Sequence, residues 1–182
     1  MPTFSAAFSN LGATLGELNE PGAALSAFRQ ALEHDPRSFT ILNNVGVVCR
    51  DLGRLDESEA ALRRVIAINP DFVFGHYNLG HTLFLGREYA GALGAYEEGQ
   101  RRDPQQNRRQ GCRLALVRFA NGDAAGAERD LWRFASAAPP DEREDLLLEA
   151  YEIAGALLTQ LPALAPQRPF LDRIGAEIAK SE

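Results

Sequence analysis

The stretch that decides the fold covers residues 39–72 and reads FTILNNVGVVCRDLGRLDESEAALRRVIAINPDF. Its first half carries an apolar stripe at helical spacing, formed by Leu42, Val45, Gly46 and Cys49. Its second half carries another, formed by Ala60, Ala61, Leu62, Val65 and Ile66. Because Pro70 cannot continue a helix, the second helix must end before it. We therefore expect two helices here, each with one apolar side to bury.

The same pattern recurs on both sides of this stretch with a period of 34 residues. Five sets of residues keep that spacing: Asn10, Asn44 and Asn78; Leu11, Val45 and Leu79; Gly12, Gly46 and Gly80; Phe28, Leu62 and Tyr96; and Pro36, Pro70 and Pro104. One helix pair cannot bury its apolar sides alone, whereas stacked pairs can. We place repeats at residues 5–38, 39–72 and 73–106, and a degenerate fourth copy at 108–141 after a one-residue insertion.

A 34-residue period with this residue order resembles the tetratricopeptide-repeat (TPR) family. The resemblance implies an all-α fold, a right-handed superhelix (solenoid) of stacked antiparallel helix pairs. The fourth copy departs from the family pattern at Gly111, where an aromatic residue or Leu is expected, and at Arg118, where a large apolar residue is expected.

The pattern changes after the fourth copy. Residues 142–160 and 169–180 each show helical periodicity, and residues 161–166 form a linker between them. TPR proteins often end in such capping helices. We therefore predict a TPR array over residues 1–141 and C-terminal capping helices over residues 142–182.

Each first helix of a repeat leaves one face opposite its packing stripe, and the resemblance implies that these faces line a concave groove that receives a peptide. We call them the groove face: Ala6, Ser9, Asn10, Ala13 and Glu17 in repeat 1; Thr40, Asn43, Asn44, Val47 and Asp51 in repeat 2; Phe74, Tyr77, Asn78, His81 and Leu85 in repeat 3; and Arg109, Cys112, Arg113, Leu116 and Ala120 in repeat 4. Asn10, Asn44 and Asn78 would form a ladder along it. Side-chain amides both donate and accept, so the ladder could bind any extended peptide backbone. The alternative is that these residues only help helices to pack.

Two further sets of residues on these helices predict which side chains the peptide has. Phe74, Tyr77 and Phe84 could form a pocket for an apolar side chain, unless the C-terminal helix at 169–180 covers them. Arg109 and Arg113 lie one turn apart and could grip a carboxylate, unless they form a solvated face.

Some TPR domains hold the C-terminus of heat-shock chaperones with a two-carboxylate clamp. Asn78, Arg109 and Arg113 fit its pattern in this sequence. The Lys and Asn of the first clamp repeat are replaced here by Asn43 and Val47. A general preference for an acidic peptide is therefore favoured over chaperone binding.

Several other functions are disfavoured. His76 lies on the packing stripe and His81 on the groove face, so the two cannot share a metal ion. No phosphate loop or nucleophile motif is present, so we expect no enzyme activity and no cofactor. The net charge of −6 argues against a nucleic-acid partner. No apolar run approaches the roughly 18 residues of a membrane span, and no secretory signal is evident, which predicts a cytoplasmic protein.

The sequence thus predicts a non-catalytic interaction module or scaffold that binds an extended peptide segment with an acidic residue or an apolar anchor. The alternative is a TPR chaperone or assembly subunit that holds an apolar segment of a client protein. Phe4 and Phe8 predict an exposed apolar edge at the first repeat. Either an earlier repeat covers this edge or another chain does so through self-association. Cys49 and Cys112 lie two repeats apart and are not expected to form a disulfide.

Overall fold

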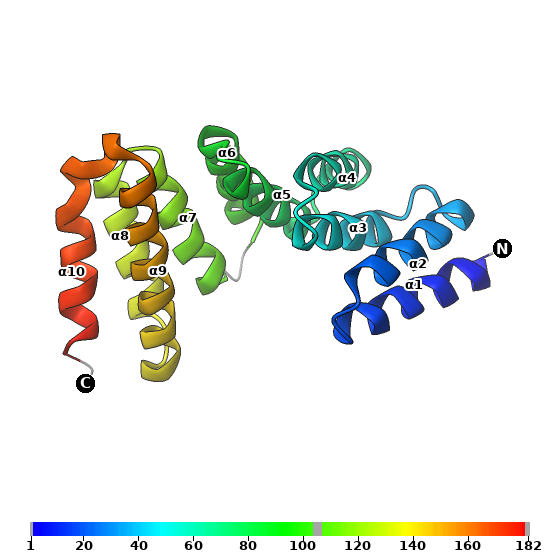
Figure 1. The fold of residues 1–182 in the computed structure, drawn as a ribbon, viewed down its shortest axis with the longest axis horizontal. Coiled ribbons are helices and arrows are strands. Elements are labelled where there is room, and N and C mark those ends of the chain that lie inside the picture. Colours follow the sequence, from blue (N-terminus) through cyan, green and yellow to red (C-terminus); the bar gives the residue numbers. More distant parts are fainter. Residues whose placement is uncertain (1, 104–106, 181–182) are drawn as a thin grey trace. The chain divides into compact units, whose positions relative to one another are not determined.

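The computed structural model describes residues 2–103 and 107–180, and all regular structure in these residues is helical (Figure 1). The helices are α1 (Pro2–Glu17), α2 (Pro21–His34), α3 (Phe39–Asp51), α4 (Leu55–Ile68), α5 (Val73–Leu85), α6 (Tyr89–Arg102), α7 (Arg108–Ala120), α8 (Ala124–Ser136), α9 (Pro140–Gln160), the 3₁₀ helix η1 (Pro162–Gln167) and α10 (Arg168–Ile178). Helices α1 to α8 pack as four consecutive pairs. The predicted all-α fold of stacked helix pairs is confirmed.

The chain forms two compact units, residues 1–102 with helices α1–α6 and residues 103–182 with helices α7–α10. In the first unit, α2 also packs on α3 and α4 packs on α5, so each pair is covered by the next. This division follows contacts within the chain, whereas the predicted boundary at residue 141 follows the repeat pattern. That boundary stays a prediction.

Within each of the first three repeats, a glycine in the first helix lies against a large side chain from the second. A Cβ atom added to Gly46 would lie 2.6 Å from Cγ of Leu62. One added to Gly12 would lie 2.8 Å from Cδ1 of Phe28, and one added to Gly80 would lie 2.5 Å from Cδ2 of Tyr96. Leu62 is fully buried as a result. Burial of such a side chain stabilises the fold by roughly 1.5–3 kcal/mol.

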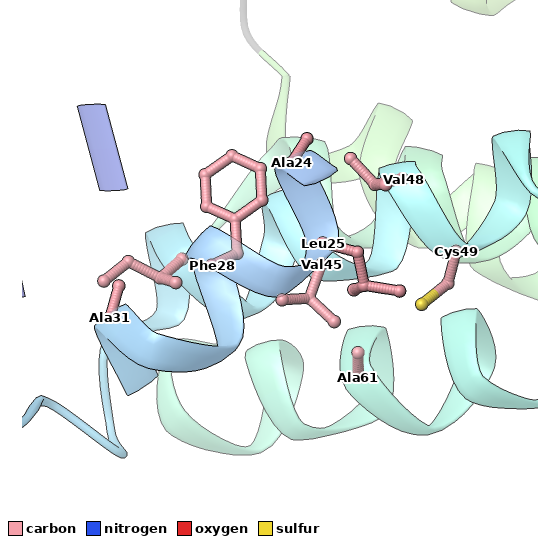
Figure 2. Packing of buried hydrophobic residues seen from close by; sticks show 9 residues of the cluster. Ala24, Leu25, Phe28, Ala31, Val45, Val48, Cys49 and Ala61 are labelled. Carbon is pink, nitrogen blue, oxygen red and sulfur yellow. The ribbon is translucent and has the colours of Figure 1, made fainter. Parts of the chain in front are cut away.

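The second helix of one repeat also packs on the first helix of the next, as the labelled residues of α2 and α3 show in Figure 2. Leu25 and Phe28 of α2 belong to the same buried cluster as Val45 and Cys49 of α3. Polar bonds cross such interfaces too: the Ser58 and Thr82 hydroxyls are 2.8 Å apart between α4 and α5. Each of the helices α2 to α5 therefore packs against the helix before it and the helix after it.

The turn inside each repeat has a left-handed residue at one fixed position. Gly53 and Gly122 have φ values of 73° and 88° there, and Asn19 and Arg87 have φ values of 59° and 64°. Glycine adopts this conformation without steric cost, which explains two of the four residues. Gly122 stands in the degenerate fourth copy, so this copy makes the same turn as the other three.

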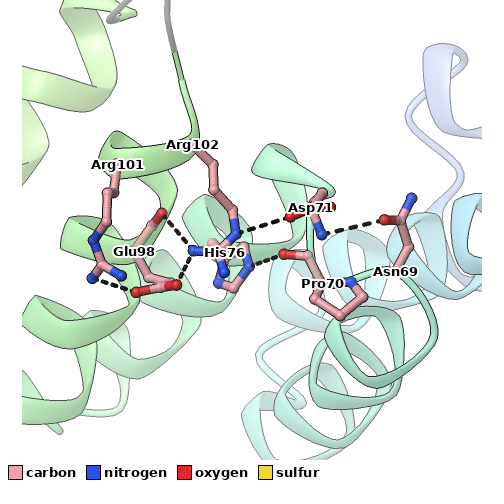
Figure 3. Close-up of polar contacts among 7 residues, drawn as sticks. All are labelled: Asn69, Pro70, Asp71, His76, Glu98, Arg101 and Arg102. Carbon is pink, nitrogen blue, oxygen red and sulfur yellow. Dashed lines mark hydrogen bonds and ion pairs between the residues drawn. The ribbon is translucent and has the colours of Figure 1, made fainter.

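The loop between α4 and α5 is tied to α6 by the polar contacts in Figure 3. His76 Nε2 lies 2.8 Å from the carbonyl oxygen of Pro70, and the His76 ring is buried, as its place on the packing stripe predicted. Arg102 of α6 bonds Glu98 and brings its Nε to 3.5 Å from Oδ1 of Asp71. These contacts hold the start of α5, and with it one edge of the groove face.

In the second unit, the two residues that depart from the family pattern, Arg118 and Gly111, each contact a side chain of α8. Arg118 reaches Asp130 of α8, with 2.7 Å between Nε and Oδ2, so an ion pair replaces the expected apolar contact. Gly111 leaves room for the ring of Phe134, which supplies the bulk that the first helix lacks. The long helix predicted at 142–160 is present as α9, and the predicted linker is the 3₁₀ helix η1 followed by α10.

The glycine contact predicts the effect of adding a methyl group. Gly46→Ala should lower the free energy of unfolding by about 1–3 kcal/mol, because the new Cβ overlaps Leu62 in a packed interface. Gly94→Ala is the matched control: no heavy atom outside its own helix surroundings lies within 4 Å of the added Cβ. That change should stabilise α6 by roughly 0.5–1 kcal/mol. Urea denaturation measures both, and equal effects would contradict the packing argument.

Candidate functional site

The first helices of repeats 1–3 lie next to one another in the first unit, where α3 contacts both α1 and α5. Most of their groove-face residues are exposed or half-buried, including Asn10, Thr40, Asn43, Asn44 and Val47. Their polar side chains therefore reach solvent along three neighbouring helices. Their role in binding a peptide stays a prediction.

A hollow of about 420 Å³ opens on this face between repeats 1 and 2. It is lined by residues of α1, of the end of α2 and of the start of α3: Ser5, Ala6, Ser9, Asn10, His34, Asp35, Ser38, Thr40 and Ile41. Asn10 and Thr40 were predicted as groove residues, and the hollow brings them together. His34 and Asp35 were missed, because the prediction considered only the first helix of each repeat.

Some polar groups of the hollow are already engaged within the chain. The Ser5 hydroxyl donates to the carbonyl oxygen of Ala31 at 3.0 Å, and the hydroxyls of Ser38 and Thr40 are 3.0 Å apart. The Asp35 carboxylate and the Asn10 amide make no hydrogen bond or ion pair with any residue that the structure describes. These two groups can therefore receive an incoming polar ligand.

The imidazole of His34 forms one wall of the hollow and is held by aromatic contacts. Its ring is stacked on Phe8, with a centroid distance of 6.0 Å and an angle of 8° between the planes. The ring of Phe4 lies 5.7 Å away. These contacts fix the plane of the imidazole beside the carboxylate of the next residue in the chain.

The predicted asparagine ladder is only partly open. Nδ2 of Asn78 donates to Oδ1 of Asn43 at 2.9 Å, which ties α5 to α3. Asn10 is exposed, and Asn44 is half-buried. One of the three amides thus bonds inside the chain, as the packing alternative expected, and the ladder as a peptide contact stays a prediction.

The predicted aromatic pocket is wrong in its composition. Tyr77 is only 3% exposed, because its ring fills the space left by Gly99 of α6. Phe84 packs edge-on against Tyr89, with 5.6 Å between ring centroids. Phe74 is 58% exposed and lies beside Phe72, with 6.0 Å between the centroids. These three predicted residues therefore do not form one pocket, and Phe74 alone offers an open apolar surface.

Other groove-face residues of α5 lie at intermediate depth or reach solvent. His81 is half-buried and Leu85 is exposed. Four residues apart along the chain, they continue the face that Phe74 and Asn78 begin. The groove face of repeat 3 therefore ends in a second open apolar side chain.

The two predicted carboxylate-binding arginines lie in the second unit and have acidic partners there. Glu149 of α9 lies 3.4 Å from Nη2 of Arg113 and 4.0 Å from Nε of Arg109. Arg108 pairs with Glu142 of the same helix at 2.9 Å. Each such partly exposed pair is worth only about 0–1 kcal/mol, but together they place acids over the arginines. The prediction of an acidic peptide relied on Arg109 and Arg113, and both already have an acidic partner within the chain.

The rest of the repeat 4 groove face is buried rather than open. Helix α9 packs on α7, and Cys112, Leu116 and Ala120 are covered. Burial, and then the charges of Glu149 and Glu142, raise the pKa of the Cys112 thiol to about 12. This face is consequently a packing surface within the second unit.

The apolar N-terminal edge is exposed as expected. Phe4, Leu11 and Leu18 of the first repeat reach solvent. The counterparts of Leu11 in repeats 2 and 3, Val45 and Leu79, are buried by the preceding helix pair. Self-association through this edge stays a prediction.

Nowhere in residues 2–103 and 107–180 do three or more His, Cys, Asp or Glu side chains gather into a set that could hold a metal ion. Nor does any helix in these ranges combine the length and the apolar composition that crossing a membrane requires.

The thiols give a testable prediction. Cys49 and Cys112 are both free and buried, and burial is the largest cause that raises the pKa of each. Because the thiolate is the reactive species, iodoacetamide at pH 8 should leave both residues unmodified in the folded chain. The same treatment in urea should add two carbamidomethyl groups, as measured by intact mass. Rapid alkylation of the native chain would contradict the burial.

The chain was compared with known proteins. Residues 10–71, within the first two repeats, match the tetratricopeptide repeat family model. Small glutamine-rich tetratricopeptide repeat-containing protein 2 of Mycosarcoma maydis is 31% identical over 83 residues, which are 46% of this chain. The matched segment spans only 24% of the length of that relative.

Solved structures show the same fold at low identity. MamA (41–end) from Desulfovibrio magneticus RS-1 has a TM-score of 0.75 and 15% identity, covering 98% of this chain and 96% of that one. The first TPR of Spaghetti (RPAP3), bound to the HSP90 peptide SRMEEVD, has a TM-score of 0.65 and 15% identity, covering 67% and 96%. Residues 10–71 thus carry the tetratricopeptide repeat, and the 34-residue period, the stacked helix pairs and the solved structures show that the chain has the tetratricopeptide-repeat fold, which is typical of protein–protein interaction.

Proposed function

We propose that this chain is a non-catalytic interaction module that holds an extended segment of a partner protein on the groove face of α1, α3 and α5. The observation that supports this most directly is the hollow of about 420 Å³ between repeats 1 and 2. Its size lies in the range of protein ligand sites. Its lining offers the unengaged amide of Asn10 and the unengaged carboxylate of Asp35.

An extended segment suits this face better than a compact ligand does. The exposed and half-buried groove-face residues run over three helices, from the hollow at α1 to Phe74 and Leu85 on α5. A peptide backbone in extended form presents a donor and an acceptor at each residue, which amide side chains can meet. Side chains of the segment would then enter the hollow and contact Phe74.

The HSP90 peptide seen in the Spaghetti structure is not carried over to this chain. A two-carboxylate clamp needs free cationic side chains, and Arg109 and Arg113 are both within 4.0 Å of Glu149. The clamp positions of repeat 2 hold Asn43 and Val47, which have no positive charge. The proposed partner is therefore not defined by an acidic C-terminus.

A second candidate function is supported by the apolar side chains of α5. Phe74 and Leu85 are 58% and 48% exposed on the same face. Open aromatic and aliphatic side chains can hold an unfolded apolar segment of a client protein. On this account the chain is a chaperone or assembly subunit, and affinity depends little on the sequence of the client.

The first candidate predicts loss of binding when the hollow is filled. Ala6→Arg places a long side chain in the hollow from an exposed position of α1, and Ala23→Arg makes the same change at an exposed position of α2 outside it. Peptides selected from a random 12-residue library on the unmodified chain should bind Ala6→Arg at least about tenfold more weakly, a loss near 1.4 kcal/mol. Their affinity for Ala23→Arg should stay within about twofold, as measured by fluorescence anisotropy. Equal affinities for both variants would overturn the site.

The second candidate predicts suppression of aggregation. Light scattering of heat-denatured citrate synthase should fall when the chain is added, and Phe74→Ser should remove most of that effect because it removes the open aromatic ring. Leu148→Ser is the control, since Leu148 is 46% exposed but lies outside the groove face. If the chain does not lower the scattering at all, the chaperone function is wrong.

A further inference from the structure

The hollow between repeats 1 and 2 carries one full negative charge. Asp35 is the only Asp, Glu, Lys or Arg among the described residues that line it. Its carboxylate makes no ion pair with any of the residues described in the structure. The neighbouring lining atoms are hydroxyls, an amide and an imidazole, which can bond an ammonium or guanidinium group only as neutral partners. A cationic side chain is thus the ligand group that the hollow can neutralise.

The charged residues of the groove face in repeats 1–3 are also negative. In repeats 1–3 the face contains Glu17 and Asp51 and no Lys or Arg. The arginines of repeat 4 already have Glu149 and Glu142 as partners within their own unit. Asp51 is paired with Arg50 of the same helix at 3.0 Å. Glu17 and Asp35, in contrast, have no such partner among the described residues. An acidic segment would meet these two like charges, which costs affinity.

An aromatic row begins beside the hollow and leads to α5. Phe39 stands between the lining residues Ser38 and Thr40, and its ring centroid is 5.1 Å from that of Phe72. Phe72 is in turn 6.0 Å from Phe74, so the row spans at most about 11 Å. An extended chain advances about 3.3 Å per residue, so three or four residues cover that length. The open end of the row is Phe74, which is exposed.

From these three observations we infer that the groove face recognises a segment with a Lys or Arg side chain and, further along the segment, a large apolar side chain. The cation enters the hollow beside Asp35, and the apolar side chain packs on Phe74. This inference rests on the proposed peptide-binding function and specifies its ligand.

The test uses the peptides selected on the unmodified chain and their variants with Lys or Arg replaced by Gln. Asp35→Asn should weaken binding of the original peptides about tenfold, the loss expected for one desolvated charge pair. Asp35→Asn should bind the Gln variants of the peptides with an affinity within about twofold of that of the unmodified chain. Glu33→Gln is the matched control, because it removes one negative charge from the same end of α2 at an exposed position that does not line the hollow. Phe74→Ser should lower affinity only for peptides that keep the apolar residue.

The outcomes separate this inference from the function on which it rests. Selected peptides that bind the hollow but show no enrichment of Lys or Arg, or that bind Asp35→Asn and the unmodified chain equally, would overturn the inference and leave the proposed function standing. Selected peptides that bind Ala6→Arg as tightly as the unmodified chain, or a selection that yields no binders, would overturn both. Enriched basic residues together with a loss specific to Asp35→Asn would support both.

Discussion

The contact of a bare glycine backbone with one large side chain sets the geometry of each of the first three repeats. Phe28, Leu62 and Tyr96 each lie over a glycine of the paired helix and are at most 3% exposed. Because a Cβ atom would not fit, this contact fixes which side of α1, α3 and α5 faces inward. Their opposite sides are then left as the groove face. Repetition every 34 residues brings these faces next to one another, and the hollow lies between the first two of them.

The constraint acts on the combined size of two residues rather than on one residue type. In repeat 3 the ring of Tyr77 lies over Gly99, and in the fourth copy the ring of Phe134 lies over Gly111. In both cases a large residue on one helix meets a glycine on the other, so the volume between the helices is conserved while the residues change. This exchange explains how the fourth copy keeps a packed helix pair although it departs from the family pattern. The contact with Gly99 also buries the ring of Tyr77, so this residue is not part of the open groove face.

The sequence predicts what depends on local pattern and fails where distant residues meet. The helix pairs, their ends and the exposure of Asn10 and Thr40 follow from the period and from apolar spacing, both of which are local. The burial of Tyr77 depends on Gly99, 22 positions later in the chain, and the pairing of Arg113 depends on Glu149 of another helix. Neither contact follows from the apolar spacing of a single helix. The part of the hollow formed by His34 and Asp35 was missed for a related reason, since it needs two repeats stacked.

The acids of helix α9 determine which charges of the chain stay available to a partner. From the sequence, Arg109 and Arg113 were expected to grip a carboxylate. In the structure, acids of α9 lie against the arginines of α7, and burial under α9 covers Cys112 between them. The basic groove-face residues are thus matched by acids of their own chain, whereas Asp35 in the first unit is not. Charges that stay unmatched within the fold determine which partner a surface attracts. On this ground the open face of repeats 1 and 2 favours a cation, although the arginines of repeat 4 had suggested an acidic peptide.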